Sequence, residues 1–567
     1  MKFTELPYSR VTLEDTHAAI EKFLSDFASA GTAEAAAELL RGYFALSTET
    51  ETNMSLAQVR YEINTKDEFY KAENDYYDEN SPAMQLDEKR VTDALLDSPL
   101  RGGLEDKFGS LMFRMFENRR KLLNEASVPL MREENKLTSK YSELLGGAEI
   151  EFDGKTLNLS QLGPYRQSSD RAVRKSATAA YFGWFAARQA EFDELFAKLT
   201  VLRDEIAKNL GFASGVEYGY AKMQRFDYDE AMVKTYRDDV KKYLVPLVSE
   251  LKLRQQKRIG VDKLRMYDND YYFKSGNPKP FGTPDEMVAH AKKMYHELSP
   301  ETGEFFDFML EGGMMDLLAK PGKAPGGFCT AFPKYKTPFI FSNFNGTKDD
   351  VDVLTHEAGH AFQVYLSMRE IDVPLYWWPT YESCEIHSMS MELITRPWMN
   401  GFFGADTEKF LYLQLEDILN FIPYGCLVDD FQHHVYRNPS ESPDERAAAW
   451  LTLERGYMPW LDYDGDAYLE SGRRWQRQSH IFSSPFYYID YTLAQNCAVQ
   501  FFLRFENGDK NAWGDYLELC KTGGSETFVK LVEIAGLRSP FDADVLKNVC
   551  ADLHRALAKT DDAAIDK

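Results

Sequence analysis

Residues 351–363 read VDVLTHEAGHAFQ and contain the pattern HExxH at His356 to His360. On a helix, residues four apart share a face, so both imidazoles can reach one metal ion. Glu357 is the next residue along the helix after His356, where it can take a proton from an attacking water without binding the metal. The surrounding apolar residues predict that this helix is buried: Val353, Leu354, Ala358, Ala361, Phe362 and Val364. The alternative is a pair of core histidines with satisfied hydrogen bonds. We disfavour it because a chance HExxH is rare in a chain with ten histidines.

A third metal ligand is expected downstream, because catalytic zinc generally takes three protein ligands and keeps one position for water. Residues 381–393 read YESCEIHSMSMEL, in which Glu385, Ser388 and Glu392 share one face of a second helix. Glu385 is the predicted ligand. Glu382 and Glu392 are the competitors, and Glu392 is alternatively a partner that orients a histidine. His387 points away from that face and is interpreted as structural or substrate-facing.

The residues before the metal helix predict loops and then one strand. Residues 320–338 are rich in helix breakers, namely Pro321, Gly322, Pro325, Gly326, Gly327, Pro333 and Pro338. Phe339–Phe341 and the following residues read as a strand that ends at Gly346. Asp349 or Asp350 is expected to cap a helix that begins near Val351. Asp352 is either a partner of the metal-binding histidines or a charge that favours the helix N-terminus.

The rest of the chain predicts a mainly α fold. Helical spacing begins with Ile20, Phe23, Leu24 and Phe27 and continues to a break at Gly146–Gly147. The segment 150–159 alternates around Asp153-Gly154, which predicts a hairpin. Helical periodicity resumes near Asp170, continues past Leu210, and dominates again after the metal helix.

The composition excludes some classes of partner. The chain has 567 residues and carries 66 Lys and Arg against 90 Asp and Glu, a net charge of −24 that argues against nucleic-acid binding. The one basic cluster, 252–258, is interpreted as a solvated helix face. The start MKFTELPYSRVTLEDTHAA lacks the pattern of a secretory signal, and we find no apolar run of membrane-spanning length. Six cysteines without a CxxC pair predict reduced thiols in the cytoplasm.

A late segment offers groups that could stabilise an oxyanion. Residues 480–491 read HIFSSPFYYIDY and supply His480 together with Tyr487, Tyr488 and Tyr491. The alternative for the tyrosines is amphipathic packing. His433 and His434 have no partner at ligand spacing and are interpreted as structural.

These motifs together resemble a known family of zinc peptidases. HEAGH is followed, 25 positions after its second histidine, by Glu385 in an ExxSMxME setting. This pattern is similar to the oligoendopeptidase F, Pz-peptidase and thimet oligopeptidase group. Further matching segments extend the resemblance from Leu199 to the C-terminus: LTVLRDEIAKNLGF at 199–212, FSNFNG at 341–346, HIFSSPFYYIDY at 480–491 and GGS at 523–525.

The resemblance implies a site and a fold. His356, His360 and Glu385 would hold one catalytic zinc ion, and Glu357 would be the general base. His480 and the tyrosines 487, 488 and 491 would stabilise the transition state, with Tyr491 the preferred phenol. The implied fold has two helical lobes around a deep substrate channel. A small β-sheet would lie beside the zinc site, with residues 339–346 as its edge strand. The expected domains are an N-terminal helical region, 1–198, and a catalytic domain, 199–567.

The leading hypothesis is therefore a cytoplasmic zinc oligoendopeptidase that cleaves short unstructured peptides and has no nucleic-acid or membrane partner. A zinc carboxypeptidase or dipeptidase with the same site is the main rival. A cationic group for a terminal carboxylate would favour that rival, and no sequence pattern identifies one. An inactive peptide-binding scaffold is a third hypothesis. The ligand set could also accept cobalt or manganese, and the sequence leaves the oligomeric state open.

Overall fold

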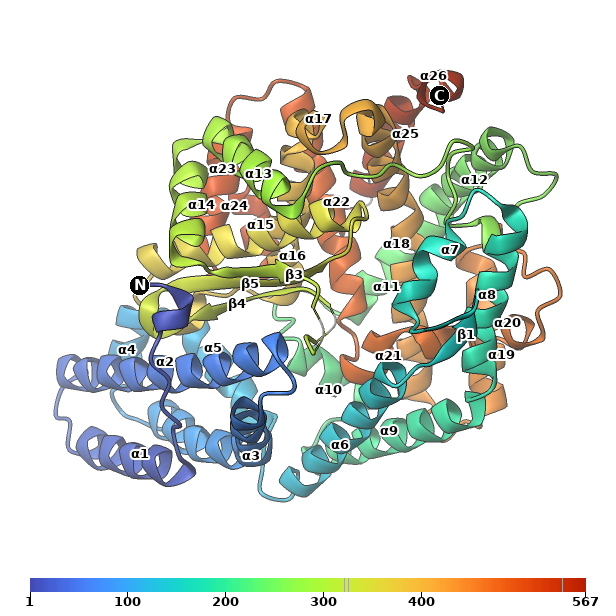
Figure 1. The fold of residues 1–567 in the computed structure, drawn as a ribbon. Helices are drawn as coiled ribbons and strands as arrows, with labels where there is room; N and C mark the ends of the chain where they lie inside the picture. Colours follow the sequence, from blue (N-terminus) through green and yellow to red (C-terminus); the bar gives the residue numbers. More distant parts are fainter. Residues whose placement is uncertain (321, 325, 543, 567) are drawn as a thin grey trace. The chain divides into compact units, whose positions relative to one another are not determined.

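The computed structural model describes residues 1–320, 322–324, 326–542 and 544–566, which form two compact units (Figure 1). The first unit contains Met1–Val128, Lys279–Gly404 and Cys497–Leu537, and the second contains Pro129–Pro278, Ala405–Asn496 and Arg538–Lys567. Helices dominate each unit, and the strands of the described residues form one two-stranded and one three-stranded sheet. The expected mainly α fold class is confirmed. None of the described helices is long and apolar enough to cross a membrane.

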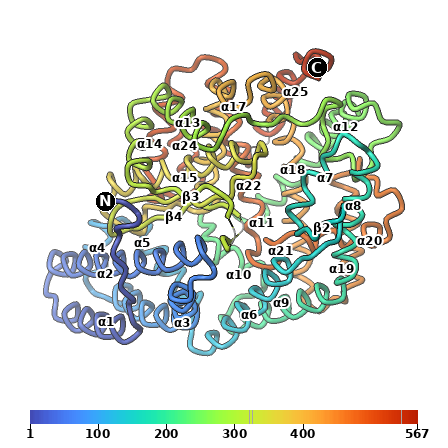
Figure 2. The backbone as a smooth tube through the Cα atoms, viewed as in Figure 1, coloured from blue at the N-terminus to red at the C-terminus, as the bar shows by residue number. Residues whose placement is uncertain are grey.

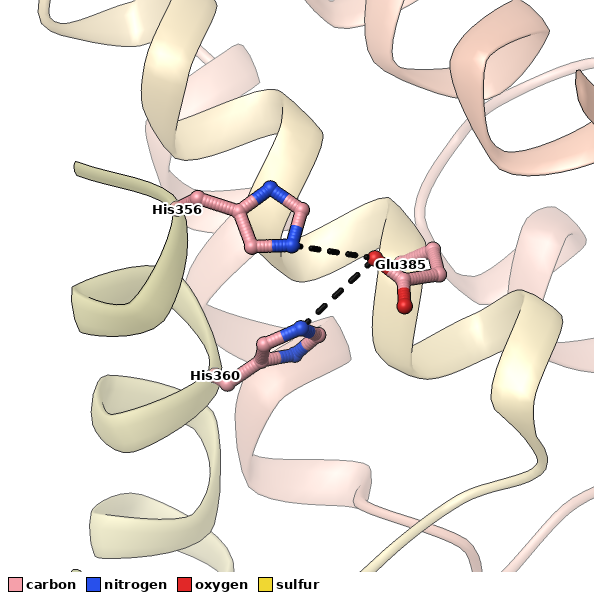
Figure 3. Close-up of side chains that lie close together, drawn as sticks. All are labelled: His356, His360 and Glu385. Carbon is pink, nitrogen blue, oxygen red and sulfur yellow. Dashed lines mark ion pairs between the residues drawn. The ribbon is translucent and has the colours of Figure 1, made fainter. Parts of the chain in front are cut away.

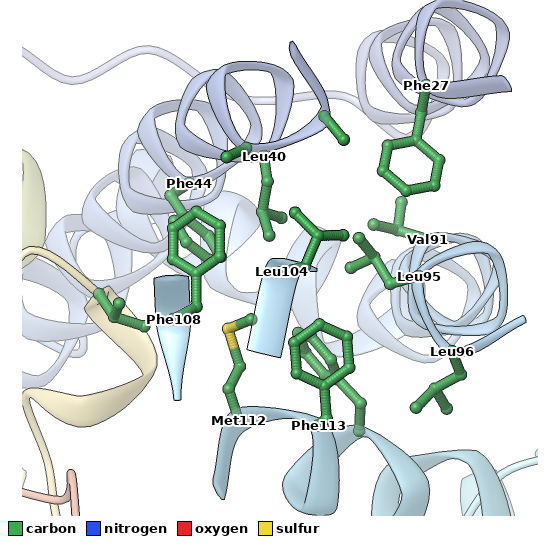
Figure 4. Packing of buried hydrophobic residues seen from close by; sticks show 14 of the residues in the cluster. Phe27, Leu40, Phe44, Val91, Leu95, Leu96, Leu104, Phe108, Met112 and Phe113 are labelled. Atoms are coloured by element: carbon green, nitrogen blue, oxygen red, sulfur yellow. The ribbon is translucent and has the colours of Figure 1, made fainter. Parts of the chain in front are cut away.

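The first unit begins with helices whose apolar faces pack around one core (Figure 4). Thr12 and Asp15 form a capping box that starts the first helix, each side chain accepting a hydrogen bond from the other residue's backbone N–H. Phe27, Leu95 and Phe113 are buried in the core that these helices enclose. The helices are α1 (Leu13–Ala28), α2 (Ala33–Ile63), α3 (Glu68–Leu96), α4 (Arg101–Phe108) and α5 (Ser110–Lys121).

A three-stranded sheet in the same unit corrects one expectation. Its strands are β3 (Met315–Leu318), β4 (Phe328–Phe332) and β5 (Thr337–Phe344), in the order β3-β5-β4. β5 runs parallel to β3 and antiparallel to β4, so it is the central strand and not the edge strand that we expected for residues 339–346. Seven of its eight residues are buried, as is typical of a central strand. Because both sides of β5 are already paired, a substrate cannot bind by adding a strand to it.

The stretch 320–338, expected to be loops, also contains a strand. Residues 328–332 read FCTAF and form β4, because aromatic and β-branched residues suit a pleated surface. Pro333 begins a short 3₁₀ turn after it. Pro338 lies inside β5, opposite Ala331 of β4. Pro321 and Pro325 lie outside the described residues.

The sheet leads directly into the helix that carries HExxH. This helix, α15 (Asp349–Glu370), begins two residues before the expected Val351. Asp350 does not cap it. Its carboxylate instead accepts hydrogen bonds from the backbone N–H groups of Asn345 and Gly346 at 2.9 and 2.7 Å, which fixes the turn between β5 and the helix. Asp352 pairs with Lys348 at 2.8 Å in the first turn of α15, as expected of a charge near a helix N-terminus.

Other helices of the first unit hold α15 in place. β4 and β5 pack against it, and Phe305 of α14 (Pro300–Gly312) contacts Phe362 and Tyr365. Figure 2 shows the backbone path through these elements. The remaining helices are α13 (Pro284–Leu298), α14 (Pro300–Gly312), α16 (Tyr381–Ile394), α17 (Asn400–Phe403), α23 (Ala512–Thr522) and α24 (Phe528–Ile534), while α22 (Tyr488–Glu506) begins in the second unit and ends in the first.

The second unit is helical except for the expected hairpin. Strands β1 (Ile150–Phe152) and β2 (Lys155–Leu157) pair antiparallel, and Asp153 and Gly154 between them have positive φ angles. The expected break at Gly146 is the end of α6. The helices are α6 (Val128–Gly146), α7 (Gly163–Arg166), α8 (Arg171–Ala186), α9 (Gln189–Asn209), α10 (Gly215–Lys222), α11 (Glu230–Asp239), α12 (Val245–Ile259), α18 (Thr407–Arg437), α19 (Pro443–Tyr457), α20 (Ala467–Glu470), α21 (Ser479–Ser483), α25 (Val545–Ala558) and α26 (Asp562–Ile565).

The basic cluster at 252–258 is not one solvated face, because Lys257 is exposed but two of its other members are buried. Lys252 and Arg258 of α12 are 3% and 8% exposed. Arg258 forms an ion pair with the buried Glu416 of α18 at 3.0 Å. The charges therefore hold two helices together, and the expectation was wrong because the sequence pattern does not reveal a partner that is distant along the chain.

The structure bears on one further expectation, the free cysteines, and leaves two others as predictions. The six cysteines are unpaired, and five of them are buried. The division at residue 198 stays a prediction, because the compact units describe packing and not the extent of a catalytic region. The substrate channel also stays a prediction.

Candidate metal centre

Three side chains from two helices converge in the first unit: His356 and His360 of α15 and Glu385 of α16 (Figure 3). Glu385 Oε2 lies 3.3 Å from His356 Nε2 and 3.6 Å from His360 Nε2. Two ligands bound to a tetrahedral zinc at its usual bond lengths lie about 3.3 Å apart. The three donor atoms therefore fit one metal ion. Glu382 lies outside this group, although it is also buried.

Neighbouring side chains orient two of the three donors. Glu392 Oε1 accepts a hydrogen bond from His356 Nδ1 at 2.6 Å, which leaves the Nε2 lone pair free for a metal. Ser388 donates to Glu385 Oε2 at 2.9 Å. Of the two roles open to Glu392 in the sequence, the structure favours the orienting partner.

Gly359 allows the two helices to approach closely enough for this arrangement. A Cβ atom at Gly359 would lie 2.7 Å from His387 O and 2.7 Å from Ser388 Cα, both in the backbone of α16. Backbone atoms cannot rotate away, so a side chain there would force the helices apart. The glycine in HEAGH therefore sets the distance between the histidines and Glu385.

Replacing Gly359 by alanine is expected to lower zinc affinity by about 10- to 100-fold, the range seen when support for a ligand is lost. Competition against a coloured chelator measures this. Gly183→Ala is the matched control, because Gly183 also lies in a helix and a Cβ atom there would meet no other described segment of the chain within 4 Å. Equal affinity for both variants would mean that helix separation does not control the site.

The environment of the site suits proton transfer at neutral pH. Burial raises the pKa of Glu357 to about 7, and its side chain lies beside the ligand group, with a residue exposure of 7%. Burial lowers the pKa of His360 to about 4, so this imidazole is neutral and able to bind a metal. A carboxylate with a pKa near neutrality is well matched to take a proton and later return it.

A second cluster lies in the second unit, around His480. The ring centroids of Tyr488, Tyr487 and Tyr491 lie 4.9, 5.7 and 5.8 Å from that of His480. Tyr491 Oη lies 3.5 Å from His480 Nε2. All three tyrosines singled out in the sequence therefore surround one imidazole.

Sequence reasoning missed two residues of this cluster. Gln478 Nε2 lies 2.9 Å from His480 Nδ1, and Tyr424 donates from its hydroxyl to Gln478 Oε1 at 2.8 Å. Tyr424 lies in the middle of α18, 54 residues before Gln478, so no local pattern could connect them. Gln478 is two residues from His480, but a lone glutamine carries no recognisable signal.

The family is established by sequence comparison. The description "Peptidase family M3" matches residues 165–550, and "Peptidase M3 N-terminal domain" matches residues 3–123. The chain belongs to peptidase family M3. It is therefore a peptidase, and the group of His356, His360 and Glu385 could hold the metal of this metallopeptidase family.

Relatives of this M3 peptidase agree with the assignment. A solved structure of Pz peptidase A with an inhibitor is 47% identical, with a TM-score of 0.95, and the match covers 99% of this chain and 100% of that one. An oligoendopeptidase F homologue from Borreliella burgdorferi is 23% identical over 74% of this chain and 72% of its own. Oligopeptidase PepF from Bacillus subtilis is 21% identical over 73% of this chain and 63% of its own.

Three further histidines of the M3 peptidase have structural surroundings. His387 is fully buried and lies near Tyr516, which donates a hydrogen bond to the His387 backbone carbonyl. This favours the structural interpretation over the substrate-facing one. His433 is fully buried between Tyr220 and Arg237, and His434 pairs with Glu441, in line with the structural roles that were expected.

Proposed function

We propose that this M3 peptidase is a zinc-dependent oligoendopeptidase that hydrolyses internal bonds of short, unstructured peptides. The observation that carries the proposal is the convergence of His356, His360 and Glu385 beside the buried Glu357. The name of the relative from Borreliella burgdorferi supports endopeptidase activity. The composition and the six unpaired cysteines support a cytoplasmic location.

Each residue has a defined task in the proposed reaction. A zinc ion held by His356, His360 and Glu385 would supply a Lewis acid that polarises the scissile carbonyl and lowers the pKa of water. Glu357 accepts the proton of the attacking water and later passes it to the leaving amine. Glu392 holds the proton on His356 Nδ1 throughout, which keeps Nε2 available as a ligand.

The proposal assigns His480 and Tyr491 to the oxyanion. Tyr424 donates to Gln478 Oε1, so the amide NH₂ of Gln478 faces His480 Nδ1 and donates to it. In its neutral form, the imidazole then carries its proton on Nε2. That N–H and the Tyr491 hydroxyl are the donors that hydrogen-bond the developing oxyanion.

Replacing Gln478 by leucine is expected to lower kcat by about tenfold or more, because loss of one oriented donor to an oxyanion costs at least that much. KM should change little, since the donor acts on the transition state. Steady-state kinetics with a quenched fluorescent peptide measure both. Gln478→Glu is the informative partner, because its carboxylate would draw the imidazole proton to Nδ1 and give a similar loss. Wild-type kcat in both variants would show that Gln478 does not orient the imidazole.

Removal and return of the metal test the proposed function. Dialysis against a chelator is expected to abolish cleavage of a quenched peptide, and one equivalent of Zn²⁺ should restore it. Cobalt or manganese is expected to restore part of the activity, because two histidines and a carboxylate accept these ions. Zinc binding without any cleavage would instead favour the inactive scaffold, and cleavage that survives complete metal removal would contradict the proposal.

A further inference from the structure

The second unit contains a cavity of about 260 Å³ that the proposed reaction does not use. Phe421, Tyr424 and Met458 form part of its apolar wall. Asn420, Arg477 and further charged side chains add polar groups to the lining. Its size suits one residue of a peptide and not a large cofactor, since sites for drug-sized ligands occupy several hundred Å³.

Two of the arginines that line the cavity are neutralised by partners. Arg166 pairs with Asp270 at 2.8 Å, and Arg474 pairs with the buried Glu454. Asp417, another lining residue, is hydrogen-bonded to Tyr272.

Arg477 differs from these neighbours. No residue in the described part of the chain forms a hydrogen bond or ion pair with its guanidinium. The guanidinium lies 5.6 Å from the ring centroid of Tyr424. The side-chain atoms Oδ1 and Nδ2 of Asn420 are both buried and have no hydrogen-bond partner among the described residues. Buried polar groups are costly unless they are paired. The cavity therefore presents to its occupant an unsatisfied amide and a guanidinium that the described residues leave without a direct hydrogen-bond partner, with Asp270 as the nearby carboxylate that favours its charge.

The chemistry of these two groups favours a carboxylate. A guanidinium offers parallel N–H donors that match the two oxygens of a carboxylate, and an amide NH₂ adds a further donor. Water alone could satisfy Asn420, but it would not give the guanidinium of Arg477 the direct two-oxygen contact that a carboxylate provides.

The cavity shares its walls with the cluster around His480. Phe421 contacts the rings of Tyr488 and Tyr491 at centroid distances of 5.7 and 6.3 Å. Tyr424, on the same wall, reaches His480 through Gln478. A group bound in the cavity therefore lies next to residues that the proposed mechanism places at the substrate.

We propose that Arg477 and Asn420 bind a carboxylate of the peptide substrate, either its C-terminal carboxylate or the side chain of an acidic residue. The ligand is assigned to the substrate on the strength of the proposed function, because the cavity adjoins the donors for the oxyanion. Peptides that place a carboxylate there bind more tightly than matched neutral peptides. If the ligand is the C-terminal carboxylate, Arg477 is the cationic group that would favour a zinc carboxypeptidase, whereas an acidic side chain is compatible with internal cleavage.

The test measures binding to full-length Glu357→Gln protein, which is expected not to consume its ligand. Isothermal titration compares three forms of one short N-acetylated peptide: the free acid, the C-terminal amide, and an amide with one internal glutamate. We expect one acidic form to bind about 10- to 100-fold more tightly than the neutral amide, the range for hydrogen bonds to a charged group. The form that gains affinity identifies the source of the carboxylate.

Substitutions then assign the gain to the cavity. Arg477→Met in the Glu357→Gln background should erase the difference between acidic and neutral peptides, and Arg477→Lys should restore part of it. Lys175→Met removes a surface charge from the same unit, where its ion pair is exposed, and should leave the difference intact. Asn420→Leu provides a second route if Arg477→Met fails to fold, and it should also reduce the difference.

Three results would overturn the inference: equal affinity for all three peptides, an acidic preference that survives both Arg477→Met and Asn420→Leu, or an equal weakening of every peptide by these variants. The proposed function is judged separately, by cleavage of the neutral amide with Glu357 intact. Cleavage without an Arg477-dependent preference would refute the carboxylate site alone. A preference without cleavage would refute the peptidase mechanism and leave the site in place.

Discussion

Replacing Glu357 by glutamine is expected to keep the metal and to lower turnover by about 10²- to 10⁴-fold, the usual contribution of a general base. Glutamine has nearly the same shape, but its amide cannot accept and return a proton. Glu357 is buried beside the ligand group without belonging to it, and burial holds its pKa at about 7. Metal content by mass spectrometry and kcat with a quenched peptide measure the two halves of this prediction.

The control for this variant is Glu370→Gln, the same change at an exposed position in α15, which should leave kcat unchanged. Near-normal turnover by Glu357→Gln with a full complement of zinc would show that another group takes the proton. Loss of the metal would show that the carboxylate holds the ion, which contradicts its assigned role.

Replacing Glu385 by glutamine is expected to weaken zinc binding by more than about 100-fold, which is the upper range for residues that only orient a ligand. The change removes the anionic donor that faces both imidazoles, at 3.3 and 3.6 Å in the structure. Turnover should fall with zinc occupancy and recover partly at high zinc concentration. Titration in buffers of defined free zinc measures the affinity.

Ser388→Ala provides a graded comparison, because Ser388 lies outside the ligand group and donates a hydrogen bond to Glu385 Oε2. We expect a loss of about 10- to 100-fold, smaller than for Glu385→Gln. An unchanged affinity in Glu385→Gln would refute the assigned ligand set and direct attention to Glu382 and Glu392, the other two carboxylates of α16.

Much of the candidate site could be predicted from the sequence because it depends on local spacing. HExxH places two histidines on one face of α15, and Glu385 lies on the inward face of the next long helix. The hairpin at Asp153-Gly154 could also be predicted from the sequence, since turn residues determine its geometry.

Features that depend on distant partners could not be predicted in this way. The apolar run of β5 suits an edge or a central strand, and only its pairing with β3 and β4 shows which it is. Arg258 is buried because Glu416 lies opposite it, 158 residues away. Gln478 owes its position to Tyr424 on another helix. In each case the deciding contact joins segments that no local periodicity connects.

The most direct test of the central claim is the digestion of unstructured peptides of graded length, with every product identified by mass spectrometry. Wild-type protein and Glu357→Gln are compared at equal zinc occupancy. The account predicts internal cuts in short peptides, with long and folded substrates spared and almost no cleavage by the variant. Stepwise removal of residues from one end would contradict the endopeptidase assignment and favour a zinc exopeptidase. Absence of products from zinc-loaded wild-type protein would contradict the catalytic account as a whole.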